Sequence, residues 1–495
     1  MQNPQENIPA QEVKTYRIDA GSLESALLAF AGQSGVNLSL NSDHLQGLNS
    51  AGLVGAFSVE EGFSHLLSET NLRVVKLEEG NYTIETKPAP TAVKALPPVI
   101  VTARTDSNVV EPSRSVTLIE KEELDTLRQG SDSLATLLGK AIAGMGDSTH
   151  TITEYGQTLR GRETLVLVDG VPLNTNRGSS RNLANINLAD VEQIEVLRGS
   201  SAIYGSGAAG GIISIRTRKP EGETQARTTI TGVVPLSKIG TSGLGGEVQH
   251  YISAASEAVD YTLSLGARHV GGSFDAKGNR VAPEPSQGDM FDSNIYSAAT
   301  KLGFKINADQ RLQLSASYYD VQQDTDYATD PSVASLPPNS VPARSIKGLD
   351  LEEQNRVQNT LFGVDYEHRN LAGNTLAAQL YYRDFFTRFA PFDARRVAVR
   401  GGNVDQSMQN SEVYGGRLTI KSPVGESKTT QLVWGGDFHN EVTDMPLDIF
   451  DPVIYDASGG LVFKKTGQLI YMPEVTTDAS GAFAQLEHRV NKRWS

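Results

Sequence analysis

Apolar and polar side chains alternate with a period of two along most of the chain after residue 226. Residues 312–318 read LQLSASY and residues 360–366 read TLFGVDY. Because successive side chains of a β-strand point to opposite faces, each such strand has one apolar face and one polar face. No run approaches the roughly 18 consecutive apolar residues of a spanning helix. A helical membrane span is therefore excluded, whereas spanning β-strands would escape a hydropathy plot.

The connections between these strands alternate in length. Short turns are expected near 256–260, 307–310, 370–374 and 422–428, and long loops near 271–292, 324–356, 389–411 and 443–477. Short turns at one end and long loops at the other are typical of an outer-membrane β-barrel, whose apolar face meets lipid and whose polar face lines the lumen. A water-soluble β-sandwich is the alternative, but it would not usually separate its loops by length so regularly. About ten antiparallel strands are expected within 224–495.

A glycine-dense segment, Thr158 to Lys219, precedes the alternating region and contains β-type runs at 164–168, 193–197 and 211–217. Its many Arg-Gly and Gly-Gly steps indicate backbone packed closely against something else. Residues 205–210 match G-x-G-x-x-G, a dinucleotide fingerprint that requires a helix after the glycines. Since an alternating strand pattern follows instead, we reject a nucleotide site. Residues 113–223 are expected to form an α+β domain.

Residues 15–87 carry a strand–helix–strand pattern twice. Ser22 is expected to cap the first helix, and Ser58 with Glu61 forms a capping box at the second. The segment is therefore expected to be a small α/β domain, preceded by a disordered stretch over 1–14.

Four prolines between residues 88 and 98 mark 88–112 as a linker. Within it, residues 98–103 read PVIVTA, which is apolar and β-branched with no partner strand nearby. A free strand of this kind can add to the sheet edge of another protein. The alternative is a linker that is only β-prone.

The composition narrows the function further. A net charge of -14 over 495 residues argues against nucleic acid as a partner. The absence of cysteine excludes disulfides and thiolate metal sites, and the eight histidines are scattered. We find no convincing catalytic motif, so an enzyme is not expected. The first twelve residues lack the apolar core of a signal peptide, so either a signal was trimmed and Met1 added or the chain is not exported.

These elements together resemble the TonB-dependent outer-membrane receptors. The family's plug signatures "RG", "DGVP", "IEVLRG", "YG" and "GG.I" have counterparts, in order, at 160–161, 169–172, 194–199, 204–205 and 210–213. The resemblance implies a plug at 113–223 and a barrel at 224–495. It also implies that plug arginines Arg160 and Arg198 latch onto barrel-wall glutamates. The segment Pro98, Val99, Ile100, Val101, Thr102 and Ala103 would be the TonB box.

The same resemblance reaches the flanking regions of the chain. Residues 15–87 resemble the secretin and TonB short N-terminal domain, which implies a periplasmic location and an anti-sigma regulator as partner. A family barrel has twenty-two strands, so the chain is expected to be truncated at its C-terminus and unable to insert alone, because lipid does not tolerate open sheet edges.

Within the family, residues 155–183, 200–215, 311–327 and 379–392 resemble the subgroup that carries ferric citrate-hydroxamate siderophores such as aerobactin, schizokinen and rhizobactin. The implied partners are the ferric siderophore, TonB and outer-membrane lipid. Iron would arrive already chelated, so no cofactor is expected. The N-terminal domain departs from the simple aerobactin receptor, which leaves ligand identity open.

Candidate ligand residues follow from charge. Because a ferric citrate-hydroxamate complex is an anion, arginine forks suit its oxygens. Residues of the polar plug excursion and of the long loops are therefore expected to face it: Arg177, Arg181, Tyr327, Arg388 and Phe392. The alternative for each arginine is a solvated loop position. Two other functions stay open, a signal transducer acting through 15–87 and a receptor for another chelate or a vitamin.

Overall fold

The computed structural model describes residues 14–40, 45, 48–68, 70, 72–78, 80–86, 116–128, 131, 133–154, 156–177, 183, 185–199, 207–220, 224–285, 287–337, 339–425 and 429–488. The chain divides into two compact units, 1–96 and 97–495. Over the described ranges, no helix is long and apolar enough to span a membrane.

Over its described residues, the first unit contains two helices and several short strands. Its elements are β1 (Lys14–Ile18), β2 (Gly21–Ser22), α1 (Leu23–Ser34), β3 (Asn37–Ser39), β4 (Asn49–Ser50), β5 (Leu53–Phe57), α2 (Val59–Leu66), β6 (Leu72–Glu78) and β7 (Asn81–Thr86). Strand β1 pairs with β5, β2 pairs with β4, and β7 lies between β3 and β6. The strand–helix–strand pattern expected from the sequence is present in both halves.

Local chemistry explains the two helices of this unit. The Ser22 hydroxyl accepts the Ser25 amide at 3.3 Å, and Gly35 ends α1 with φ of 77°. The capping box between Ser58 and Glu61 is present at α2. The helices meet through Phe30 and Phe63, whose rings lie edge to face with centroids 4.9 Å apart.

The second unit begins with a five-stranded sheet, here called the plug sheet. Its elements are β8 (Val116–Ile119), α3 (Lys121–Leu127), α4 (Leu134–Ala141), β9 (Thr164–Val168), β10 (Val171–Pro172), the 3-10 helix η4 (Leu188–Asp190), β11 (Val191–Arg198) and β12 (Gly211–Thr217). The strand order is β10-β9-β12-β11-β8, with β12 and β9 parallel. A strand, β12, follows the glycines of 205–210, so the nucleotide fingerprint lacks its helix. At Gly211 a Cβ would lie 2.4 Å from the Leu197 carbonyl oxygen, which explains the glycine.

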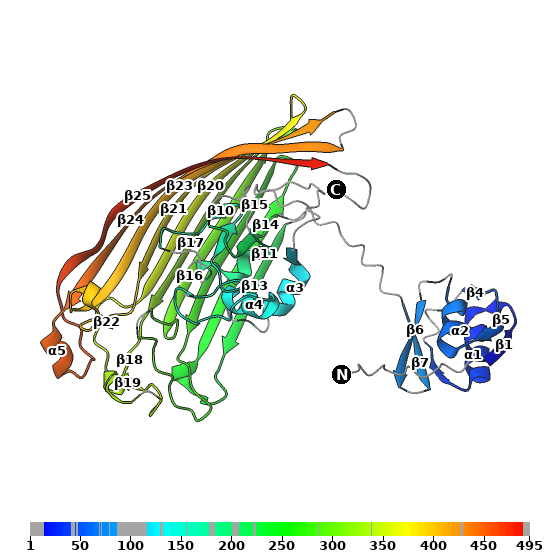
Figure 1. Ribbon diagram of the computed structural model, residues 1–495, viewed down its shortest axis with the longest axis horizontal. Helices are drawn as coiled ribbons and strands as arrows, with labels where there is room; N and C mark the ends of the chain where they lie inside the picture. Colours follow the sequence, from blue (N-terminus) through cyan, green and yellow to red (C-terminus); the bar gives the residue numbers. More distant parts are fainter. Residues whose placement is uncertain are drawn as a thin grey trace, which may run out of the picture. The chain divides into compact units, whose positions relative to one another are not determined.

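The rest of this unit is built around a single curved sheet with ten long antiparallel strands, here called the wall (Figure 1); the short strand β22 (Phe392–Asp393) also pairs into this sheet. The strands are β13 (Gln225–Val233), β14 (Gly245–Ala255), β15 (Val259–Val270), β16 (Ser293–Lys305), β17 (Gln310–Gln323), β20 (Arg356–Leu371), β21 (Asn374–Arg388), β23 (Val404–Val424), β24 (Thr430–Phe450) and β25 (Lys465–His488). They pair in sequence order, with β13 and β25 at the two ends of that order. The expected count of about ten strands is confirmed.

The two faces of the wall have inverted exposure. On β21, Gln379 is 2% exposed whereas Leu380 is 56% exposed. On β15, Thr262 and Ser264 are buried whereas Leu265 is exposed. The polar face is thus covered by the plug region and the apolar face is uncovered. A water-soluble sandwich buries its apolar face instead, so this alternative is wrong.

The long connections hold short elements of their own. These are η6 (Thr241–Gly243), β18 (Tyr327–Thr329), η7 (Pro331–Ser335), β19 (Ser345–Lys347), β22 (Phe392–Asp393), η8 (Ala398–Arg400) and α5 (Pro452–Ala457). Three short turns lie where the sequence predicts them, and part of the fourth, near 422–428, lies outside the described residues. Two long-loop boundaries were wrong. The connection expected at 443–477 spans only 451–464, and the one expected at 389–411 ends at 403, because β23, β24 and β25 extend for 21, 21 and 24 residues. Their outer ends mix apolar and polar residues without a strict period of two, as in residues 469–472, which read LIYM, so the alternation fades before the strands end.

Candidate functional site

A buried lysine of the wall holds the Asp-Gly turn of the plug. The Lys301 ammonium lies 2.9 Å from the Asp169 carboxylate and donates to the Thr217 carbonyl at 3.1 Å. Asp169 has a φ of 48° and also accepts the Thr217 amide at 3.0 Å. Both charges are largely buried, which is tolerable only because they are paired. This contact fixes the DGVP turn against β16.

Two further wall residues hold the chain just after that turn. Arg383 of β21 is fully buried, donates to the Leu173 carbonyl at 2.5 Å and donates to Asn359 at 2.7 Å. Glu441 of β24 is 1% exposed and accepts the Asn176 amide at 3.0 Å. Residues 173–176 are therefore bonded to the wall on two sides, and they position Arg177.

The two arginines expected to latch the plug lie elsewhere. Arg160 is exposed, and its backbone amide donates to the Gly144 carbonyl at 2.7 Å. Arg198 donates to Thr117 at 2.7 Å and to the Ala143 carbonyl at 3.5 Å, both within the plug region. Pairing with barrel glutamates stays a prediction. Of the contacts described above, those of Lys301 and Arg383 join wall cations to plug acceptors, whereas Glu441 accepts a plug backbone amide.

Sequence reasoning missed Lys301, Arg383 and Glu441, although a signal was present. Each lies on the polar face of its strand, where a charged side chain in an alternating segment must point toward the plug. The partner atoms are a turn carboxylate and backbone groups, which no pattern reveals.

Arg177 is the candidate ligand residue that the plug places best. Its guanidinium lies over the ring of Phe389, with 4.4 Å from Cζ to the centroid. Phe389 is 1% exposed and follows β21 directly. Phe389 was not among the candidate ligand residues. Arg181 and the segment 98–103 lie outside the described residues.

Arg388 does not join Arg177. Its neighbour Thr387 and the preceding Phe385 are buried on the inner face of β21, so Arg388 takes the outer face. It forms an ion pair with Glu353 at 2.8 Å and lies over Phe386. Arg388 therefore already has a carboxylate partner and faces away from the plug.

The two candidate aromatic residues each lie beside an arginine, in different loops. Tyr327 belongs to the β17–β20 connection, and the Arg280 guanidinium lies 3.9 Å from its ring centroid. Phe392 belongs to the β21–β23 connection, and Arg400 lies 5.8 Å from its ring centroid. Both arginines have carboxylate partners, Asp292 and Asp405.

Known protein families match both parts of the second unit. The TonB-dependent receptor plug domain matches residues 108–212, and the TonB-dependent receptor-like β-barrel matches residues 300–495. The chain belongs to the TonB-dependent receptor family. The curved wall with the plug on its polar face agrees with this family.

Curated relatives of this TonB-dependent receptor include siderophore receptors. The rhizobactin receptor of Rhizobium meliloti (strain 1021) is 28% identical over 408 residues, covering 81% of this chain and 54% of the relative. The ferric aerobactin receptor of Escherichia coli is 30% identical over 402 residues, covering 79% of this chain and 53% of the relative. The chain thus spans about half the length of these relatives.

Solved structures share the fold. The ferripyoverdine receptor of the Pseudomonas aeruginosa outer membrane superposes with a TM-score of 0.54 at 14% identity, covering 96% of this chain and 62% of that one. The ferric yersiniabactin uptake receptor of Yersinia pestis gives a TM-score of 0.52 at 16% identity, covering 77% of this chain and 55% of that one. At such identities the likeness concerns the fold.

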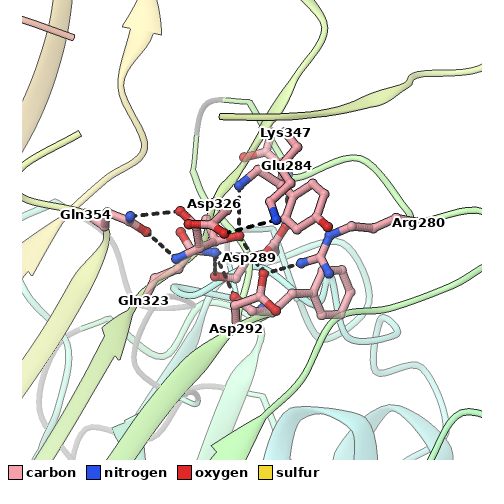
Figure 2. Close-up of polar contacts among 11 residues, drawn as sticks. Arg280, Glu284, Asp289, Asp292, Gln323, Asp326, Lys347 and Gln354 are labelled. Carbon is pink, nitrogen blue, oxygen red and sulfur yellow. Dashed lines mark hydrogen bonds and ion pairs between the residues drawn. The ribbon is translucent and has the colours of Figure 1, made fainter. Parts of the chain in front are cut away.

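The long-loop end of the receptor carries a polar network around Asp289 and Asp292 (Figure 2). Arg280 and Thr325 both donate to the Asp292 carboxylate. The Gln323 amide donates to Asp289 at 3.1 Å. Burial raises the pKa of Asp289 to about 6, against the opposing effect of the amides of Glu284 and Phe291 that donate to it.

A second network ties two other loops together. Arg395 lies 2.7 Å from Asp393 and 2.7 Å from Asp456, which joins the β21–β23 loop to α5. Hydrogen bonds to these two carboxylates raise the pKa of Arg395 above its ordinary value. Across the part of the chain that the structure describes, no group of three or more His, Asp or Glu side chains could hold a metal ion.

Proposed function

We propose that the protein is an outer-membrane receptor that imports a ferric siderophore of the citrate-hydroxamate class by a TonB-dependent mechanism. The observation that carries this proposal is the similarity to receptors named for rhizobactin and ferric aerobactin, which extends over both plug and wall. The inverted exposure of the wall supports the membrane location, since only an apolar solvent favours exposed Leu380 beside buried Gln379. Iron enters as a chelate, so the receptor needs no cofactor.

The ligand-binding part of the proposal centres on the apex of the plug. Arg177 stacks on Phe389, which orients the plane of its guanidinium, and wall residues hold the chain that carries it. A planar guanidinium suits the carboxylate and hydroxamate oxygens of an anionic chelate. Arg181 follows four residues later on the same polar excursion. Tyr327 and Phe392 would contribute from the loops, whereas Arg388 is dropped because it faces outward.

Import then requires the plug to move. In the proposed mechanism the ligand binds at the long-loop end, TonB pairs with 98–103, and a pull breaks the plug–wall contacts. The ion pair of Lys301 with Asp169 and the hydrogen bonds of Arg383 would have to open. Arg160 and Arg198 remain proposed partners of barrel glutamates on this path.

Growth on single siderophores tests the substrate. The test strain keeps the gene for this protein at its native locus and lacks all other siderophore receptors. It should grow with ferric aerobactin, schizokinen or rhizobactin as the sole iron source. Arg177→Ala should weaken binding of radiolabelled ferric aerobactin at least tenfold, whereas Arg396→Ala, a loop arginine without a place in the proposed site, should not. Growth on another chelate or a vitamin alone would contradict the proposal.

A second candidate function is signalling through residues 15–87. It is favoured by the separate compact unit with its own buried core, including Phe30 and Phe63. The unit would lie in the periplasm and contact an anti-sigma regulator. Deletion of 1–87 should leave import intact and abolish induction of iron-regulated genes. Unchanged induction would remove the signalling role.

A further inference from the structure

The plug segment 148–154 has an unusual backbone. His150 and Glu154 both have positive φ, 54° and 50°, although neither is glycine. Left-handed backbone is unfavourable for such residues and persists only where the surroundings over-determine it. Strain at two positions four residues apart therefore indicates that something holds the intervening residues in place.

A buried carboxylate supplies part of that hold. Glu154 is 1% exposed and accepts the Ser148 hydroxyl at 2.7 Å and the Thr149 amide at 2.8 Å. It accepts the Thr149 hydroxyl as well, at 3.2 Å. These bonds fold the segment back on itself and present Ile152 outward from the plug.

Ile152 is the point where the plug meets the wall and a long loop together. Its amide donates to the Gly288 carbonyl at 2.9 Å, and the adjacent Thr151 forms an antiparallel bridge with Asp289. Its side chain packs into an apolar cluster on the inner face of the wall, with Ile295, Tyr319, Val321, Val357 and Phe385. The loop approaches closely here, since a Cβ on Gly288 would lie 1.8 Å from the Asn355 side chain.

The far side of this contact is the network of Figure 2. The Asp289 carboxylate is 4% exposed and accepts the amides of Glu284 at 3.0 Å and Phe291 at 2.9 Å, so it folds the turn that carries Gly288. Gln323 joins that turn to β17, donating to Asp289 and, at 2.9 Å, to the Phe291 carbonyl.

The network continues from the turn to the loops. Asp292 follows the turn and accepts from Arg280, whose guanidinium covers Tyr327. A second arm runs through Gln354, which exchanges two hydrogen bonds with the backbone of Thr325, at 2.8 and 2.9 Å. Contacts are thus continuous from Tyr327 in one long loop, through the turn of another, to Ile152 in the plug.

We propose that the turn carrying Gly288 and Asp289 is the joint through which the long loops act on the plug, and that Asp289 is the positioning residue that holds it. The role of this joint in import rests on the proposed transport function, whereas the contacts that form the joint do not. Coupling requires an element with two arrangements. The strained segment 148–154 is such an element. When the loop releases Ile152, the backbone of His150 and Glu154 can leave the left-handed region.

A ligand-free experiment tests the joint itself. Arg280→Met removes the ion pair to Asp292 at the loop end of the network, and hydrogen exchange is then measured over residues 148–154 of the full chain. Exchange of the Ile152 amide should become at least tenfold faster, while the wall strands keep their protection. The matched control is Arg344→Met, which removes a loop arginine paired with Asp330 at 2.9 Å outside this network. Unchanged exchange in Arg280→Met, or an equal change in Arg344→Met, would overturn the joint.

A transport experiment separates positioning from mere stability. In cells that make the protein from its own gene, Asp289→Ala should lower the maximal import rate of radiolabelled ferric aerobactin at least fivefold and leave its binding affinity within twofold. Asp289→Asn keeps one acceptor oxygen and should restore most of the rate. Import at the parental rate in Asp289→Ala, or binding that falls in proportion to import, sinks the proposal. If the parent protein itself binds no ferric aerobactin, the proposed substrate is wrong. The hydrogen-exchange experiment still tests whether the joint couples the loops to the plug.

Discussion

The plug sheet and the wall are both built from β-strands, yet they bury opposite kinds of side chain. In β9 all five residues of TLVLV are buried, and Ile194 and Val196 of β11 and Ile213 of β12 are fully buried in one apolar core. In β21 the buried residues include Gln379 and Arg383, while Leu380 is exposed. The same strand geometry therefore serves an apolar interior in one sheet and a polar interior in the other. What covers each face decides which side chains it carries.

Removal of a wall cation should have the largest effect, because the polar interior depends on pairing. Lys301→Met leaves the Asp169 carboxylate buried without its ammonium, and loss of one partner of a buried pair costs about 3–5 kcal/mol. Hydrogen exchange of the 164–172 region in detergent micelles would show this as local unfolding. The matched variant Lys301→Arg keeps the charge and should retain most of the protection. Equal protection in Lys301→Met and the parent would mean that the wall holds the plug without this ion pair.

A charge placed on the uncovered face of the wall should have the next largest effect on stability. It tests whether lipid or water contacts that face. Leu380→Arg is expected to destabilise the protein by about 2–4 kcal/mol in lipid vesicles, the cost of arginine on the lipid face of a barrel near the midplane. Denaturant titration in vesicles measures it. In a water-facing sheet the same change would cost almost nothing, so a near-zero result would contradict the membrane assignment. Leu371→Arg, at the exposed end of β20 beside a short turn, serves as the control at the edge of the apolar band.

The sequence predicted most of this contrast, and its failures have physical causes. Alternation located the strands and the short turns correctly, because both depend on local pattern. It also held the answer for Arg388, which shares its face with Leu380 and Tyr382, but the loop position was read as ligand-facing. Contacts such as Arg383 with the Leu173 carbonyl join residues 210 positions apart. Their partners are backbone atoms, which leave no trace in residue type.

The turn that carries Asp289 lies where the polar interior meets the loops, and pH should reveal it. The pKa of Asp289 is raised to about 6 by burial, above its unfolded value of about 3.9. A raised acid pKa means that stability is fully present below the unfolded pKa and is lost as pH rises through 6. Between pH 7 and pH 4 the parent should therefore gain on the order of 2–3 kcal/mol relative to Asp289→Asn, which does not titrate.

Thermal unfolding of both proteins across that pH range checks the expectation for Asp289. The groups that face this carboxyl are Arg280, Glu284, Asp292 and Gln323. A stability difference that stays constant from pH 4 to pH 7 would show that Asp289 titrates normally. A comparison in Asp292→Asn separates the contribution of the neighbouring carboxyl.

The smallest expected effect on stability is for a substitution in the first unit. The core of this unit is apolar, like that of the plug sheet and unlike the polar interior of the wall. Ser58 caps α2 and is 2% exposed, and its hydroxyl accepts the Glu61 amide at 3.4 Å. Loss of such a cap costs about 1 kcal/mol. Ser58→Ala should therefore speed hydrogen exchange in 59–67 about fivefold, the factor that corresponds to roughly 1 kcal/mol. Ser68→Ala, just beyond the helix, is the control. Because the two units have separate cores, exchange in the plug sheet and the wall should be unchanged; faster exchange there would show that the units share their stability.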